Sequence, residues 1–258
     1  MRNLSRPAYR FNWRREFTPA IRGLIVANCA VFTLQRIAGL ATSGETDRWF
    51  AEWFGLIPVL AGPGLRVWQL LTYMFLHAGV LHLLFNMFTL WMFGRDLEPA
   101  WGARRFLVYY FLTGIGAGVC VVLVNLVPEL WGHPQPISVT MGASGAIYGI
   151  LMACALLFPD RQVWLIPLPI VISMRMFVLI WGAIAFFGSL EGAGNGISHV
   201  AHLGGLLVGY AYIRRGSYFF NLRNHYTDWR QRRLRRKFEV YMREHRDEPP
   251  APPGGWVH

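Results

Sequence analysis

Six apolar runs, separated by polar or charged segments, dominate the pattern of this chain. A membrane-spanning helix needs roughly 20 mostly apolar residues. Shorter runs rich in Gly and Ala also span membranes where other helices enclose them. The pattern therefore predicts an all-α integral membrane protein with six transmembrane helices. The predicted spans cover about residues 22–41, 80–97, 106–127, 143–158, 176–190 and 197–213.

Basic residues are distributed unevenly between the loops that join these spans. Of the 25 lysines and arginines, 22 lie in or beside the two terminal segments, the second loop and the fourth loop. Only Arg36, Arg48 and Arg66 fall on the other side. Because basic loops favour the cytoplasmic side of a membrane, we expect six spans with both termini cytoplasmic.

The same distribution divides the chain into three parts. Residues 1–21 are expected to form a basic cytoplasmic segment, residues 22–213 the membrane domain, and residues 214–258 a basic, partly disordered cytoplasmic tail. The N-terminal segment does not resemble a cleavable signal peptide. We therefore expect a bacterial plasma membrane protein, with an organelle membrane as the alternative. The external segment 42–79 is rich in aromatic residues and is expected to lie partly in the headgroup layer.

Composition agrees with a membrane protein and narrows its partners. Hydrophobic residues make up 54% of the chain and charged residues only 15%, whereas soluble domains are closer to a quarter charged. The net charge of +11 suits either nucleic acid or anionic lipid. A basic tail that directly follows a span favours lipid, so we expect no nucleic acid partner. Cys29, Cys120 and Cys154 lie in apolar runs and are expected to be buried hydrophobic residues rather than metal ligands or disulfides.

Polar side chains gather at one end of three of the predicted spans. The second, fourth and sixth spans all run from the external to the cytoplasmic side. Polar residues inside a membrane are costly and usually functional, so their presence at one depth favours a site near the external face. The residues concerned are His77, His82, Asn86, Ser144, Ser198, His199 and His202.

Residue spacing indicates which of these groups meet. Ser144 and Tyr148 are four residues apart and so share a helix face. Small-residue stripes, with Gly145 in the fourth span and Gly205 in the sixth, favour close packing of the two helices. That packing would bring Ser144 to a histidine that could activate it. The nearest acid in sequence to the sixth span is Glu191, in a loop, so a Ser–His dyad is favoured over a triad, with Tyr148 stacked on the base.

Four motifs on these spans resemble those of the rhomboid family of intramembrane serine proteases. The resemblance covers roughly residues 22–213 and implies the six-transmembrane-helix rhomboid bundle. The motifs are GASG at 142–145 followed by Tyr148, HAGVLHLLFN at 77–86, AHLGG at 201–205, and LEPAWG with Glu98 and Gly102.

The resemblance also implies a role for each site residue. Ser144 is the nucleophile and His202 the general base and then acid. The Ser144 backbone N–H, His82 and Asn86 stabilise the oxyanion. His77 supports the site by hydrogen bonding, and Gly142 and Gly145 let the backbone pass close to the substrate. Expected substrates are transmembrane helices cut near the external face, and neither a metal nor a cofactor is expected.

One departure from the family pattern and several alternatives stay open. Many members carry a Trp-Arg pair in the first external loop, where this chain has Trp68-Gln69, which leaves the role of that loop open. His199 is a rival for the base. Ser144 and the glycines could be simple packing residues, and His82 and Asn86 could only join helices. The rival functions are a catalytically inactive rhomboid-like protein that binds membrane clients, and a proton-coupled or metal transporter.

Overall fold

The computed structural model describes residues 17–62, 64–132, 138–165, 170–190 and 199–215, and they are mostly helical. The chain forms two compact units, Met1–Ala211 and Tyr212–His258. In the second unit only residues 212–215, which are helical, are described. The first unit contains α2 (Pro19–Ala41), α3 (Glu45–Phe54), α4 (Pro58–Ala61), α5 (Gln69–Thr72), η1 (Tyr73–Phe75), α6 (Val80–Trp101), α7 (Ala103–Leu130), α8 (Ser144–Leu157), β1 (Gln162–Trp164), β2 (Val171–Ser173), α9 (Met174–Leu190) and a helix over residues 199–211.

The long apolar helices identify a multi-pass membrane protein. Within the described residues, α2 and Ala103–Pro128 of α7 are long and apolar enough to cross a bilayer. The segment Gln69–Phe75 and α6 pass the same test together but meet at a bend of 97°. α8 and α9 are shorter apolar helices of 14 and 17 residues. Each of the six predicted spans therefore overlaps a helix, and two or three of these helices have the full length of a span.

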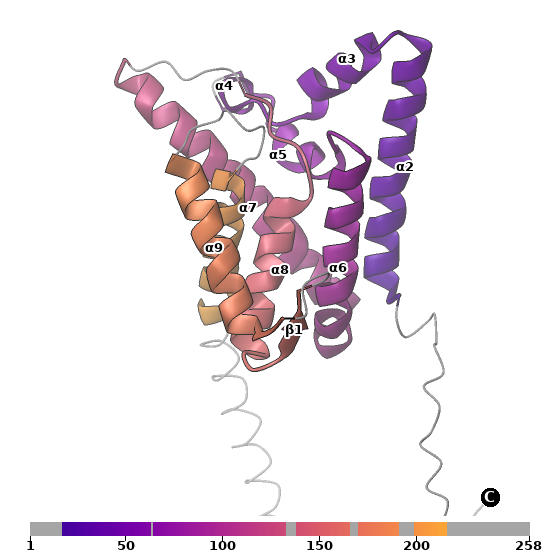
Figure 1. The fold of residues 1–258 in the computed structure, drawn as a ribbon. Coiled ribbons are helices and arrows are strands. Elements are labelled where there is room, and N and C mark those ends of the chain that lie inside the picture. Colours follow the sequence, from indigo (N-terminus) through magenta and orange to yellow (C-terminus); the bar gives the residue numbers. More distant parts are fainter. Residues whose placement is uncertain (1–16, 63, 133–137, 166–169, 191–198, 216–258) are drawn as a thin grey trace, which may run out of the picture. The chain divides into compact units, whose positions relative to one another are not determined.

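α8 is a short helix because its neighbours cover it on most sides. It packs against α6, α7 and α9, and Figure 1 shows it between α6 and α9. Most of its residues, from Gly145 to Cys154, are buried. α9 differs, because large apolar side chains such as Phe187, at 63% exposure, line its outer surface. Enclosure by other helices thus explains why α8 is short and rich in Gly and Ala. It does not explain the short length of α9.

The segment between α2 and α6 is folded into short helices rather than a long irregular loop. α3, α4, α5 and η1 occupy it. Trp49 makes an edge contact with Phe54, and the Arg66 guanidinium lies 4.5 Å from the centre of the Trp53 ring. Figure 1 shows α4 and α5 close to the chain that leads into α8, which makes this segment a scaffold for the start of that helix.

Glu98, near the end of α6, fixes the start of α2. Its carboxylate accepts hydrogen bonds from the backbone N–H groups of Ala20 and Ile21, at 2.8 and 3.0 Å, and from the Thr18 hydroxyl. The first N–H groups of a helix have no partner within the helix, so a carboxylate there satisfies them and complements the positive end of the helix dipole. Glu98 is only 3% exposed, so these hydrogen bonds join α2 and α6 in a nonpolar setting.

Candidate active site

Ser144 begins α8, and the backbone before it is held at two points. Leu56 and Thr140 exchange two backbone hydrogen bonds of 2.9 Å, and the Gly142 N–H donates to the Tyr73 carbonyl at 2.9 Å. Gly142 has a φ of 121°, which a residue with a side chain rarely adopts. The turn into α8 therefore depends on glycine at 142 and on the scaffold formed by α4, α5 and η1.

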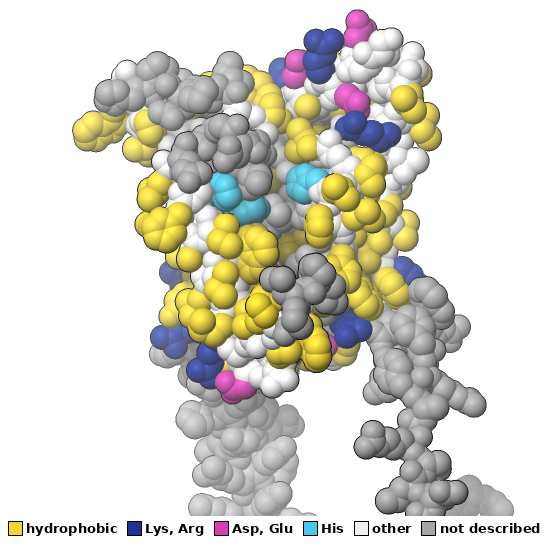
Figure 2. Space-filling model, in the orientation of Figure 1, with side chains coloured by type: hydrophobic (Ala, Val, Ile, Leu, Met, Phe, Trp, Pro, Cys, Tyr) yellow, Lys and Arg dark blue, Asp and Glu magenta, His cyan; other side chains and the backbone are white. Residues whose placement is uncertain are grey.

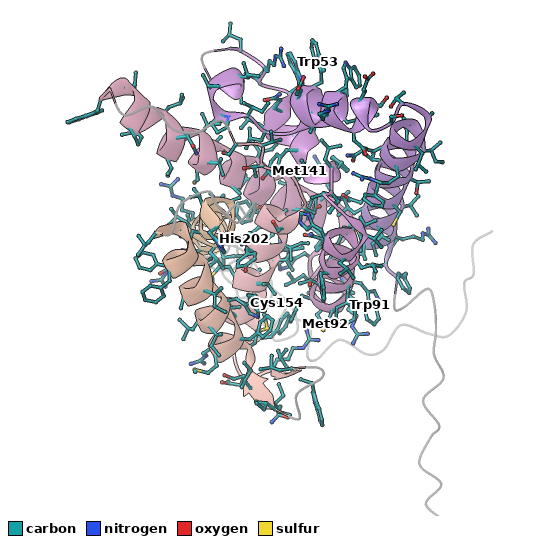
Figure 3. The ribbon with its side chains drawn as sticks, turned by 45° about the horizontal axis from the view of Figure 1, so that its top comes forward. Trp53, Trp91, Met92, Met141, Cys154 and His202 are labelled. Carbon is teal, nitrogen blue, oxygen red and sulfur yellow. The ribbon has the colours of Figure 1, made fainter. Side chains whose placement is uncertain are left out.

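A hydrogen bond joins Ser144 to the helix over residues 199–211. The distance between Ser144 Oγ and His202 Nε2 is 2.9 Å, so the hydroxyl can donate to an unprotonated Nε2. The Tyr148 ring stacks on the His202 imidazole, with centroids 4.2 Å apart and planes 5° from parallel. Figure 3 shows His202 facing α8 between Met141 and Cys154 in that view. Ser144, His202 and Tyr148 thus lie together at the N-terminal end of α8.

Close glycine contacts place the two helices near enough for this hydrogen bond. A methyl group added to Gly205 would overlap the Gly145 carbonyl, and one added to Gly209 would lie 3.1 Å from the Gly149 Cα. On the other side of α8, a methyl group on Gly149 would lie 2.5 Å from the Thr113 Cβ of α7. The two small-residue stripes therefore meet, as is usual where helix backbones approach closely in lipid.

His82 lies beside the turn that leads into Ser144. Its Nδ1 accepts a weak hydrogen bond of 3.4 Å from the Ala78 N–H, which leaves the proton on Nε2. A methyl group on Gly142 would lie 2.8 Å from His82 Nε2 and 3.9 Å from the Ser144 backbone nitrogen. Two N–H donors therefore border the same small space next to the Ser144 hydroxyl. This is the arrangement that stabilises a developing oxyanion.

Asn86 and His77 both contact His82. The Asn86 side-chain amide donates to the His82 carbonyl, one turn earlier in α6, at 2.8 Å, and has a second N–H to offer. The ring of His77 meets that of His82 edge-on, with centroids 5.1 Å apart. His77 is fully buried. Its ring packing therefore supports His82, and its expected role in hydrogen bonding stays a prediction.

His199, the rival for the base, lies beside His202. Its ring is perpendicular to that of His202, with centroids 6.0 Å apart, and it packs on α9 at Gly188. Figure 2 shows histidine side chains reaching one face of the molecule in two groups above a hydrophobic region. The structure thus brings His202, rather than His199, to Ser144.

Two expectations about this site lie wholly or partly beyond what the structure describes. Glu191 and Ser198 belong to the undescribed segment 191–198, so the preference for a dyad over a triad stays a prediction. Among the described residues there is no group of three or more His, Cys, Asp or Glu side chains placed to hold a metal ion.

Gln69 is a structural residue of the site that the sequence did not single out for a role. Its side chain is fully buried, with the amide nitrogen 2.9 Å from the Glu52 carbonyl and the amide oxygen accepting from the Ile57 N–H at 3.2 Å. Ile57 follows Leu56, which pairs with Thr140. Gln69 therefore holds the scaffold that positions the turn into α8.

Comparison with known proteins gives a consistent result. A family model described as the Rhomboid domain matches residues 64–219. A relative from Bos taurus, the mitochondrial presenilin-associated rhomboid-like protein, is 31% identical over 206 residues, which is 76% of this chain and 48% of the relative. The chloroplastic rhomboid-like protein 16 of Arabidopsis thaliana is 26% identical over 223 residues, 81% of this chain and 66% of the relative.

A third relative carries an activity in its name. Rhomboid-like protease 5 of Toxoplasma gondii is 37% identical over 151 residues, 55% of this chain and 16% of the relative. The chain therefore spans less than two thirds of the length of each of these relatives.

Proposed function

Because this chain belongs to the rhomboid family, most of whose members are serine proteases acting on transmembrane substrates, we propose that it is an intramembrane serine endopeptidase. It hydrolyses peptide bonds of transmembrane substrate helices near the external membrane face. The observation that carries this proposal is the 2.9 Å hydrogen bond between Ser144 Oγ and His202 Nε2, with Tyr148 stacked on the imidazole. A serine hydroxyl is a weak nucleophile unless a base of this kind activates it.

The first half of the reaction forms an acyl-enzyme. Ser144 Oγ attacks the carbonyl carbon of the scissile bond while its proton passes to His202 Nε2. The Ser144 N–H, His82 Nε2–H and the free N–H of Asn86 stabilise the oxyanion. His202 then gives its proton to the leaving amine, and the C–N bond breaks.

The second half returns the enzyme to its starting state. A water molecule loses a proton to His202 and attacks the acyl carbon. The second tetrahedral intermediate then collapses, and His202 returns the proton to Ser144 Oγ as the new carboxyl terminus leaves. His202 thus acts as base and then acid in each half, and no metal or cofactor takes part.

The proposed membrane arrangement is a six-transmembrane-helix rhomboid bundle formed by residues 22–213. Residues 1–21 and 214–258 are the cytoplasmic segments, and anionic lipid is the partner of the basic tail. The proposal rests on the distribution of basic residues and on a helix in each of the six apolar runs. A bacterial plasma membrane is the proposed location. Two relatives are named as mitochondrial or chloroplastic, which makes an organelle membrane the alternative.

The test is covalent labelling of the purified protein by a fluorophosphonate, with the labelled peptide identified by mass spectrometry. We expect label on Ser144, none in Ser144→Ala, and labelling slowed by roughly 10³-fold or more in His202→Ala. Ser189→Ala is the matched control, because Ser189 is also near the outer end of its helix but its hydroxyl donates to the Phe186 carbonyl at 2.6 Å. An unlabelled wild type would favour the client-binding function instead.

A further inference from the structure

The C-terminal end of α9 packs directly on the ring of His199. A methyl group added to Gly188 would lie 2.5, 2.6 and 2.7 Å from Nε2, Cε1 and Cδ2 of that ring. Carbon atoms in van der Waals contact are normally about 3.5–4.0 Å apart. Only the absence of a side chain at 188 therefore lets the ring approach the α9 backbone this closely.

His199 also contacts His202, the proposed base. The rings of His199 and His202 are perpendicular, with centroids 6.0 Å apart, and His202 stacks in turn on Tyr148 of α8. A continuous row of contacts thus runs from the α9 backbone through two imidazoles to α8. Protein interiors are close-packed, so a displacement at one end of such a row is passed along it.

Within the described residues, no hydrogen bond of Nδ1 accounts for the presence of His199. Its Nδ1 is shielded from solvent and, within the part of the chain that the structure describes, has no hydrogen-bond partner. Leaving such a group unpaired is destabilising, so an unpaired group in a native structure calls for an explanation. The shape of the ring, which fills the space between Gly188 and His202, supplies one.

We propose that His199 is a positioning residue that couples the position of the C-terminal end of α9 to the position of His202. The ring of His199 packs on Gly188 of α9. The inference rests on the proposed function, since it concerns the base of that reaction. Phe186 and Phe187, which directly precede Gly188 in α9, are 50% and 63% exposed, so their rings add little packing that would hold this end of α9 in place. A lipid, substrate or partner that shifts α9 therefore changes the Ser144–His202 geometry and with it the rate.

The direct test is Gly188→Ala compared with Gly182→Ala in the same helix. A methyl group at 182 meets Leu206 Cδ1 at 3.4 Å, an ordinary contact. A methyl group at 188 must displace the His199 ring by roughly 1–1.5 Å to reach normal contact. Because a misplacement of about 1 Å can cost 10²-fold in rate, we expect Gly188→Ala to slow both fluorophosphonate labelling of Ser144 and kcat about tenfold or more. Its KM should be unchanged, and Gly182→Ala should react like the wild type.

A double mutant separates positioning from loss of fold. Removing the ring in His199→Ala makes room for the new methyl group, so Gly188→Ala should cause little further loss of labelling rate in that background. His199→Phe keeps a ring in the space and should retain most of the rate that His199→Ala loses. Melting temperatures in detergent control for unfolding.

Two results would overturn the inference while leaving the proposed function intact. One is a Gly188→Ala variant that is labelled as fast as Gly182→Ala. The other is an equal loss from Gly188→Ala with and without His199. A wild type that is never labelled would overturn the proposed function, and this inference with it.

Discussion

Ser144 and His202 are separated by 58 residues in sequence. The pattern of spans predicted that Ser144 approaches a histidine of the sixth span, and the family resemblance selected His202 over His199. Topology placed both at the same depth, and the stripes containing Gly145 and Gly205 indicated that their helices touch. The residues that hold this arrangement were less predictable. Gln69 and Gly188 act through partners distant in sequence, so neither has a local pattern that marks it. The Asn86 bond to the His82 carbonyl likewise depends on a rotamer that spacing does not determine.

Tyr148 is expected to act through its ring rather than its hydroxyl. The ring stacks on His202 at 4.2 Å, and a stacked aromatic pair is worth about 0.5–1.5 kcal/mol. Tyr148→Phe should therefore keep kcat close to the wild-type value, and Tyr148→Ala should lower it about 2- to 10-fold or more. Steady-state cleavage of a transmembrane substrate measures both. Equal losses in the two variants would show that the hydroxyl, not the ring, matters.

His82 and Asn86 are expected to contribute to the transition state rather than to substrate binding. Loss of one oxyanion donor typically costs about 10²–10³ in kcat, and we expect that loss for His82→Ala and Asn86→Ala with KM nearly unchanged. Asn125→Ala is the matched control, because its amide makes the same 2.8 Å bond to the carbonyl four residues earlier, on α7. If Asn125→Ala loses as much activity as Asn86→Ala, the effect belongs to helix stability instead.

At the scale of the elements, the apolar runs predicted the helices but not the short helices and contacts that connect them. Each apolar run contains a helix, with α2 beginning at Pro19 and α8 at Ser144. The short helices between α2 and α6 were not predicted, because aromatic residues and prolines at irregular spacing have no clear period. Their arrangement depends on Gln69 and on the pairing of Leu56 with Thr140, which are contacts between distant residues.

Glu98 is expected to be a stabilising rather than a catalytic residue. Its buried carboxylate accepts three hydrogen bonds at the start of α2, and hydrogen bonds to a charged group are each worth about 1.5–3 kcal/mol. Glu98→Ala should destabilise the protein by about 3 kcal/mol or more, which lowers the melting temperature by roughly 6–12 °C for a domain of this size. Thermal unfolding in detergent measures this. Glu52→Ala is the control, since the Glu52 side chain is exposed and only its carbonyl is used; a similar fall in both variants would contradict the role of Glu98.

At the scale of the whole molecule, the proposed topology gives opposite accessibility to two exposed sites. Ser43 follows α2, and Asp160 lies between α8 and α9. With Cys29, Cys120 and Cys154 replaced by alanine, Ser43→Cys should react with an impermeant maleimide in intact cells. Asp160→Cys should react only after the membrane is permeabilised. Labelling of both sites in intact cells would contradict six spans with cytoplasmic termini.

The central claim is that Ser144 and His202 form the catalytic dyad of an intramembrane protease. The most direct measurement is cleavage of a generic transmembrane substrate in detergent by the wild type, Ser144→Ala and His202→Ala, with melting temperatures as the control for folding. We predict cleavage by the wild type and a loss of roughly 10⁴-fold or more in each folded variant. Cleavage that persists in a folded His202→Ala variant, or a wild type that binds the substrate without cutting it, would contradict the claim.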